Sequence, residues 1–89
     1  MKNTVPKVLI YGTLFCPYCF AAKRLLKQYN IEFKEIRVDK DPELKQKMIS
    51  KSGRFTVPQI FIDEYHVGGY DDLVEHTKNG KLKKLMVAV

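Results

Sequence analysis

The chain has 89 residues, which is enough for one hydrophobic core and too few for a second, and its composition of 45% hydrophobic and 29% charged residues is typical of a soluble globular domain. No apolar run approaches the roughly 20 residues that cross a bilayer, and Val8-Leu9-Ile10 is too short to be the core of a secretory signal. We therefore expect a single cytoplasmic domain over residues 1–89 with no membrane association, in a compartment that keeps thiols reduced.

The net charge of +6 raises the question of an acidic partner. A nucleic-acid site would gather the basic side chains on one face among aromatic rings, whereas here they are distributed along the chain. We interpret them as solvated helix faces and expect no nucleic-acid partner; a functional alternative is the attraction of small anionic thiols and acidic partner surfaces. These residues are Lys23, Arg24, Lys27, Lys45, Lys47, Lys51, Lys78, Lys81, Lys83 and Lys84.

The first predicted elements are a strand and a helix. Residues 8–11 form a short apolar run ended by Gly12, which is typical of a buried strand. Pro17 suits the first turn of a helix, because its fixed φ fits there and its missing N–H would be unpaired anyway. The helix should pack on a sheet through an apolar stripe at positions i, i+3, i+4 and i+7, formed by Ala22, Leu25, Leu26 and Tyr29.

A second strand and a second helix follow. Residues 33–38 predict a strand that runs parallel to the first, because a helix connects the two. Asp41-Pro42-Glu43 supplies an N-cap, a proline at the first helical position and an early acid, and Gly53 ends the helix. Its apolar side consists of Leu44, Met48 and Ile49.

The last third of the chain predicts a hairpin and a helix. Residues 58–62 are apolar enough for a central strand, and residues 65–67 return antiparallel after a tight connection. A last helix runs from Tyr70 or Asp71 to Asn79, and residues 81–86 can add one more turn after Gly80. The order β-α-β-α-β-β-α predicts an α/β fold, with helices on both faces of a mixed four-stranded sheet.

The two cysteines, Cys16 and Cys19, stand two residues apart where the first strand gives way to the first helix. They are too close in sequence to crosslink distant parts of a fold, so their value lies in a reversible mutual disulfide. At a helix start Cys16 would accept backbone N–H groups and lie at the positive end of the helix dipole, which favours the thiolate. We predict Cys16 as the nucleophile and the more covered Cys19 as the resolving thiol. Pro17 would stiffen the turn, and Tyr18 would be exposed beside Cys16.

A zinc site and a purely structural pair of thiols are the other interpretations of this spacing. Zinc usually takes four ligands, and only His66 and His76 remain, at a separation that does not fit a zinc motif. Buried thiols are common but are rarely paired in this way. We expect no metal and interpret both histidines as surface residues.

Three motifs together resemble a dithiol glutaredoxin, most closely the small bacterial type. They are Cys16-Pro17-Tyr18-Cys19 after a strand, Thr56-Val57-Pro58 before one, and Gly68-Gly69-Tyr70-Asp71-Asp72 at the start of the last helix. A CxxC pair alone is a weak signal, but three motifs in this order over about residues 8–85 are specific. The resemblance implies the thioredoxin-like fold of glutaredoxins, with glutathione as the co-substrate.

The resemblance also implies a glutathione site. The Val57–Pro58 bond would be cis, and the backbone N–H and C=O of Val57 would pair with glutathione as with a short antiparallel strand. The start of the last helix would hold the γ-glutamyl carboxylate and Asp72 its ammonium, although Asp71 or Asp72 could equally serve as a helix cap. The implied glutathione-binding residues are Tyr18, Lys45, Thr56, Val57, Pro58, Gly69, Tyr70, Asp71 and Asp72.

Two further positions, Lys45 and Thr13, bear on glutathione binding. Lys45 stands where similar proteins place a side chain for the glycine carboxylate of glutathione, and it is equally well explained as a solvated helix lysine. Thr13 occupies the position, three residues before Cys16, where similar proteins often carry a lysine. We therefore expect the Cys16 thiolate to depend more on the helix terminus, and glutathione to bind more weakly.

The resemblance implies a monomeric enzyme that reduces protein disulfides and glutathione mixed disulfides at the expense of glutathione, and so contributes to cell redox homeostasis. Its partners would be glutathione and glutathionylated or disulfide-containing proteins. One alternative is a dimer that shares an iron–sulfur cluster through Cys16 and two glutathiones, against which the stiff Pro17 argues. Another alternative is a redoxin of similar fold that thioredoxin reductase recycles.

Overall fold

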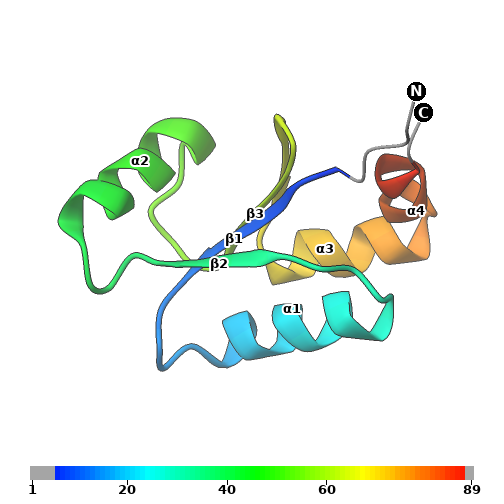
Figure 1. Ribbon diagram of the computed structural model, residues 1–89, viewed down its shortest axis with the longest axis horizontal. Coiled ribbons are helices and arrows are strands. Elements are labelled where there is room, and N and C mark those ends of the chain that lie inside the picture. Colours follow the sequence, from blue (N-terminus) through cyan, green and yellow to red (C-terminus); the bar gives the residue numbers. More distant parts are fainter. Residues whose placement is uncertain (1–5, 88–89) are drawn as a thin grey trace.

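A computed structural model describes residues 6–87 as a four-stranded sheet with helices on both faces (Figure 1). The predicted class and element order are confirmed, with one addition at the end of the chain. Gly80 adopts a left-handed φ of 79°, which ends one helix and starts another instead of extending it by a turn. The elements are β1 (Val8–Gly12), α1 (Pro17–Gln28), β2 (Lys34–Arg37), α2 (Pro42–Ser52), β3 (Gln59–Ile62), β4 (Tyr65–Gly68), α3 (Tyr70–Lys78) and α4 (Lys81–Met86).

The sheet has the strand order β2-β1-β3-β4 and is mixed. Strand β1 runs parallel to β2 and antiparallel to β3, with Ile10 opposite Ile60, and β3 runs antiparallel to β4. All four residues of β3 are buried, as its apolar sequence predicts for a central strand. The second strand is shorter than predicted, because Phe33 and Val38 lie just outside β2.

The helices form two layers around the sheet. Helices α1 and α3 cover one face, where Ala22, Leu26 and Leu73 pack on Ile10 and Ile60 (Figure 1). Helix α2 covers the other face through Met48, which lies in a second cluster with Tyr11, Val38 and Phe61. No helix within residues 6–87 has the length and apolarity that a membrane crossing requires.

The local signals at the helix ends are confirmed, with one error. Asp41 caps α2 by accepting the Glu43 N–H at 2.9 Å, and Gly53 ends this helix with a left-handed φ of 72°. Helix α1 begins at Pro17 as predicted. The assignment of Tyr29 to the apolar stripe is wrong: α1 ends at Gln28, so Tyr29 is its C-cap and stays 50% exposed.

Candidate active site

The two cysteines lie at the N-terminal end of α1, in the arrangement that the sequence predicts. Both are free thiols, and Cys16 is the N-cap residue, with extended backbone angles. Its Sγ accepts a hydrogen bond from the Cys19 N–H at 3.2 Å. The first turn of α1 contains no acidic residue, so no carboxylate opposes negative charge on this sulfur. The helix terminus therefore directs a backbone N–H and the positive end of its dipole at the Cys16 sulfur.

Cys19 differs from Cys16 in its surroundings. The residue is 1% exposed, compared with 8% for Cys16. Burial, and after it the hydrogen bond with Cys16, raises the pKa of the Cys19 thiol from an ordinary value of 9.0 to about 12. At neutral pH Cys19 is consequently a protonated thiol, which suits a group that acts second.

The end of β1 lies directly against this thiol. A Cβ added to Gly12 would stand 2.8 Å from the Cys19 Sγ, closer than real Cβ contacts come. Glycine at this position therefore lets α1 approach the sheet with Cys19 on its inner side. This is a second reason for Gly12 besides ending the strand, and sequence spacing alone does not show it.

The turn between β1 and α1 is held from the end of β2. Asp39 accepts a hydrogen bond from the Leu14 N–H at 3.3 Å, and its carboxylate pairs with Arg37 at 2.7 Å. The Arg37 hydrogen bond lowers the pKa of Asp39 to about 2, so this carboxylate stays ionised at neutral pH. The contact positions the residues that precede Cys16, and it could not be predicted because Asp39 is distant along the chain.

A pocket of about 220 Å³ lies beside the first turn of α1. It brings together eight of the nine predicted glutathione-binding residues, and Lys45, exposed on α2, is not among its lining. Tyr18 is 62% exposed, and its ring centroid stands 6.1 Å from that of Tyr70 across the pocket. The lining consists of Tyr18, Arg54, Thr56, Val57, Pro58, Gln59, Gly69, Tyr70, Asp71 and Asp72.

The peptide segment on one wall of this pocket has the predicted cis bond between Val57 and Pro58. Within residues 6–87, the backbone N–H and C=O of Val57 form no hydrogen bond with other protein groups. Two strong backbone groups at a pocket wall are therefore available to a ligand. This is the geometry that strand-like pairing with an extended peptide needs.

Another wall is the start of α3, where Asp72 has a structural role. Its Oδ2 accepts the Gly69 N–H at 2.9 Å and pairs with Arg54 at 3.1 Å. The Gly69 hydrogen bond is the main cause that lowers the pKa of Asp72, and Arg54 adds to it. Gly68 makes room for this carboxylate, because a Cβ there would collide with it, and Gly68 also has a φ of 116°. The capping interpretation of Asp72 is thus confirmed.

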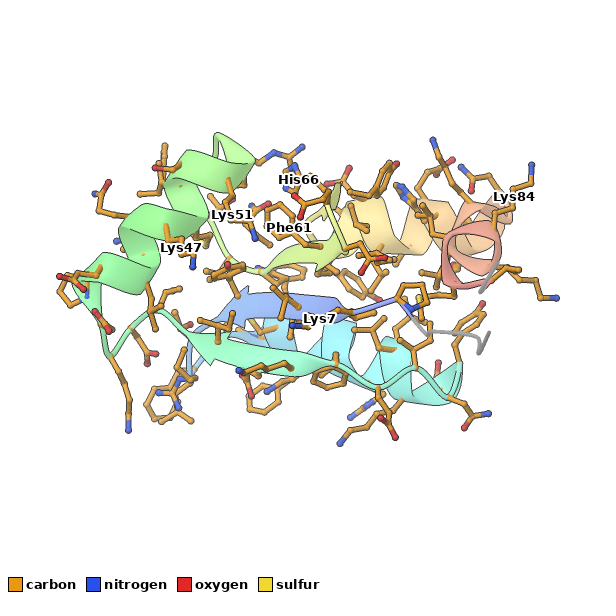
Figure 2. All side chains as sticks on the ribbon, turned by 45° about the horizontal axis from the view of Figure 1, so that its top comes forward. Lys7, Lys47, Lys51, Phe61, His66 and Lys84 are labelled. Carbon is orange, nitrogen blue, oxygen red and sulfur yellow. The ribbon has the colours of Figure 1, made fainter. Side chains whose placement is uncertain are left out.

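A buried hydrogen-bond chain that the sequence did not reveal supports the Thr56 side of the pocket. Gln59, 1% exposed, donates from Nε2 to the Thr56 carbonyl at 3.0 Å and to Thr56 Oγ1 at 3.3 Å. Its Oε1 must then accept, so His66 donates from Nε2 over 2.7 Å. Burial and the charge of Arg54 lower the pKa of His66, which keeps the ring neutral at neutral pH. Figure 2 shows His66 beside Phe61. The two rings stack with their centroids 4.8 Å apart.

The prediction that both histidines are surface residues is wrong. His66 is half-buried and belongs to the hydrogen-bond chain through Gln59. His76 is also half-buried: it donates from Nδ1 to the Asp72 carbonyl at 2.6 Å and accepts the Tyr65 hydroxyl at 2.9 Å. Neither belongs to a metal-binding cluster, since within residues 6–87 no three His, Cys, Asp or Glu side chains are placed to hold an ion.

Comparison with known proteins gives consistent matches over most of the chain. The family model for glutaredoxin matches residues 3–67. Glutaredoxin of Pseudomonas aeruginosa is 49% identical over 84 residues, which is 94% of this chain and 100% of that protein. Glutaredoxin 3 of Escherichia coli is 46% identical over 79 residues, which is 89% of this chain and 95% of that protein.

Solved structures agree with these relatives. The solution structure of glutaredoxin from Brucella melitensis superposes with a TM-score of 0.83 at 46% identity, covering 94% of this chain and 91% of that one. The crystal structure of a buckwheat glutaredoxin–glutathione complex has a TM-score of 0.83 at 26% identity, covering 91% and 76%. The backbone thus follows that of the family through the thioredoxin-like sheet, and nearly half of the aligned residues are identical to those of its bacterial members, so the chain belongs to the glutaredoxin family of thiol–disulfide oxidoreductases.

Proposed function

We propose that this protein is a glutathione-dependent oxidoreductase of the cytoplasm that reduces protein disulfides and glutathione mixed disulfides, and so contributes to cell redox homeostasis. The observation that carries this proposal is the asymmetry of the two thiols. Cys16 caps α1 and accepts a backbone N–H, whereas Cys19 is buried behind it with its pKa raised to about 12. Cys16 would therefore attack first, and Cys19 would act second, as the resolving thiol.

A protein disulfide would be reduced in two exchanges. The Cys16 thiolate attacks one substrate sulfur, forms a mixed disulfide and releases the other substrate sulfur as a thiolate. Cys19 then loses its proton and attacks the Cys16 sulfur, which releases the second substrate thiol and leaves a Cys16–Cys19 disulfide. Two glutathione molecules return the pair to thiols and leave as glutathione disulfide, which balances the two electrons.

A glutathione mixed disulfide requires Cys16 alone. Its thiolate attacks the glutathione sulfur, the protein leaves as a thiol, and a second glutathione attacks the Cys16–glutathione adduct to give glutathione disulfide. The pocket beside Tyr18 would hold the tripeptide in this adduct. Its cysteinyl residue would pair with the backbone of Val57, and its γ-glutamyl carboxylate would accept N–H groups at the start of α3. Asp72 would balance the γ-glutamyl ammonium while it keeps its cap.

The glycine carboxylate of glutathione has two candidate partners. Lys45 remains our prediction from the resemblance, and Arg54 is a cation that lines the pocket itself. Comparison of Lys45→Ala with Arg54→Ala distinguishes them. The substitution that removes the partner should raise the KM for glutathione several-fold and leave kcat nearly unchanged.

Two cysteine variants test the proposed reaction. Cys16→Ser should abolish turnover of both hydroxyethyl disulfide and a protein disulfide, because no other sulfur is placed to attack. Cys19→Ser should retain turnover of glutathione mixed disulfides and lose reduction of the protein disulfide, because that step needs the resolving thiol. The measurement is NADPH consumption coupled through glutathione reductase. Turnover by Cys16→Ser would show that the nucleophile is assigned to the wrong residue.

A further inference from the structure

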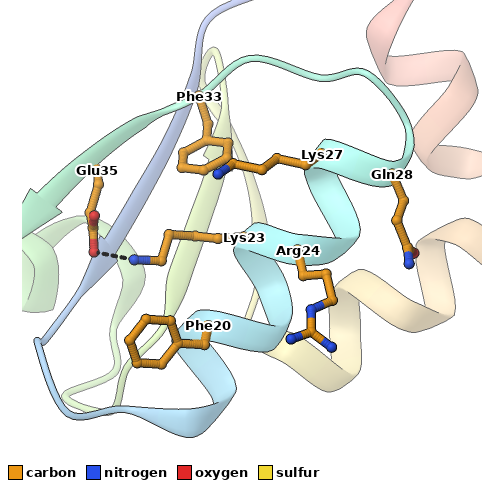
Figure 3. A pocket seen from close by; sticks show the side chains of 7 residues that line it. All are labelled: Phe20, Lys23, Arg24, Lys27, Gln28, Phe33 and Glu35. Carbon is orange, nitrogen blue, oxygen red and sulfur yellow. Dashed lines mark hydrogen bonds and ion pairs between the residues drawn. The ribbon is translucent and has the colours of Figure 1, made fainter.

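A second hollow, of about 680 Å³, lies on the other side of α1, between this helix and β2. We call it the α1–β2 groove. Figure 3 shows Phe20 and Phe33 on either side of the ion pair between Lys23 and Glu35, whose Nζ and Oε2 are 2.9 Å apart. The groove is lined by Phe20, Lys23, Arg24, Lys27 and Gln28 of α1 and by Phe33 and Glu35.

The groove begins one helical turn from the reactive sulfur. The Phe20 N–H donates to the Cys16 carbonyl at 3.1 Å, so the two residues are stacked neighbours along α1. Phe20 is 56% exposed, a large apolar surface left in water beside the active site. Lys23, Arg24 and Lys27 follow at three, four and seven residues from Phe20, a spacing that continues along the same side of the helix.

The groove carries a net positive charge that the fold does not neutralise. Lys23 is half-buried, pairs with Glu35 and lies 4.9 Å from the Phe20 ring centroid, so its charge is engaged. Arg24 and Lys27 are exposed, and neither takes part in an ion pair within residues 6–87. Helix α1 contains no Asp or Glu. Two cations therefore remain free to meet carboxylates of a partner.

The groove and the glutathione pocket lie on opposite sides of α1. The pocket is built mainly from the segment that leads into β3 and from the start of α3, whereas the groove is completed by β2, at the far edge of the sheet. A ligand in one would leave the other open. Both contain residues of α1, the helix that Cys16 caps.

We infer that the α1–β2 groove is the docking surface for the protein substrate and selects segments that carry acidic residues near the reacting cysteine. This inference rests on the proposed function and adds a substrate class to it. The apolar end at Phe20 would take an apolar side chain of the segment, and the free charges of Arg24 and Lys27 would take its carboxylates.

The helix geometry gives the spacing of the preferred segment. At about 1.5 Å per residue, Phe20 lies about 6 Å, Arg24 about 12 Å and Lys27 about 16 Å along the axis from Cys16. An extended chain advances about 3.3 Å per residue. The favoured segment therefore has an apolar residue about two positions from its cysteine and acidic residues about four and five positions from it.

The experiment uses two peptides, each with one glutathionylated cysteine. In the acidic peptide, Leu stands two residues from the cysteine and Asp and Glu stand four and five residues from it, on both sides, so that either chain direction can dock. In the neutral peptide, Asn and Gln replace the acids. Turnover is measured with glutathione at low and high salt, and hydroxyethyl disulfide serves as a substrate too small to reach the groove.

We expect kcat/KM at low salt to be about tenfold higher for the acidic peptide than for the neutral one, and the preference to shrink at high salt. The double variant Arg24→Glu with Lys27→Glu should lose the preference and retain hydroxyethyl disulfide turnover. The matched control, Lys47→Glu with Lys84→Glu, changes the net charge equally and should keep the preference. Figure 2 shows these lysines on α2 and α4, and neither lines the groove.

Two results would overturn the inference while leaving the proposed function intact: equal kcat/KM for the two peptides, or the same loss of preference in the control variant. In the latter case the total charge, and not the groove, would attract the peptide. Absence of hydroxyethyl disulfide turnover in the unmodified protein would instead contradict the proposed function itself.

Discussion

At the scale of single residues, the active site depends on side chains that never touch a reacting atom. Gln59 is the clearest case, because its buried amide links Thr56 on the pocket wall to His66 on β4. Every polar atom of that amide has a partner, so the link fixes the position of Thr56. Glutathione paired with the adjacent Val57 would bind more weakly if this wall became less rigid.

Replacement of Gln59 by Leu tests this role. The change leaves His66 and Thr56 without their buried partner, which should lower the free energy of unfolding by about 1–3 kcal/mol. The KM for glutathione should rise several-fold, while alkylation of Cys16 keeps its rate because α1 is untouched. Gln46→Leu, at an exposed position of α2, is the matched control and should change neither quantity. An unchanged KM in Gln59→Leu would show that Thr56 is held by other contacts.

At the scale of elements, the N-termini of α1 and α3 both lie at the site, and a side chain of the site accepts a backbone N–H at each. Helix α1 is capped by the sulfur of Cys16 and α3 by the carboxylate of Asp72. Glycine at position 69 has no side chain to offer, so the cap of α3 depends on Asp72. Asp72 accepts the Gly69 N–H, and the next residues of α3 line the pocket, so the start of this helix suits a carboxylate ligand.

The stability contributed by Asp72 should depend on pH in a defined direction. Its pKa is lower in the folded protein than the ordinary value of 3.8, so the stabilisation is complete above that value and is lost as the pH falls through the folded pKa. At neutral pH, Asp72→Ala should lower the free energy of unfolding by about 1 kcal/mol and the melting temperature by about 4–8 °C. The difference from the unmodified protein should vanish in acid.

Thermal unfolding followed by circular dichroism between neutral pH and acid measures this effect. Asp71→Ala is the control, because Asp71 lies in the same turn and is exposed. It should show only the small loss that removal of one charge near a helix N-terminus causes. A stability gap for Asp72→Ala that persists in acid would mean that the carboxylate charge is not its cause.

At the scale of the whole molecule, the features that could be predicted from the sequence are those that depend on neighbouring residues. Pro17, Asp41-Pro42 and Gly53 mark helix boundaries because their effects act on neighbouring backbone, and the alternation of strands and helices follows from them. The CxxC pair was likewise recognised from residues that are close together in the sequence. Tyr29 was misassigned because its spacing fits the apolar stripe, but α1 ends at Gln28 and Tyr29 is its C-cap.

The contacts that complete the site could not be predicted, because they join residues far apart in the chain. Arg54 meets Asp72 across 18 positions, and Leu14 meets Asp39 across 25. Gln59 lies in an apolar strand, where nothing in the sequence shows that its amide finds partners. Only the folded sheet brings these groups together, and it also separates the pocket beside Tyr18 from the α1–β2 groove on either side of α1.

The central claim is the division of labour between the two sulfurs, and competitive alkylation tests it most directly. The reduced protein is treated at neutral pH with a limiting amount of iodoacetamide, and the labelled cysteine is identified by mass spectrometry of the digested chain. Because the pKa of Cys19 is raised to about 12, we predict that nearly all label is on Cys16, and that both cysteines react once the protein is denatured. Equal labelling of the two cysteines in the native protein, or faster labelling of Cys19, would contradict the account.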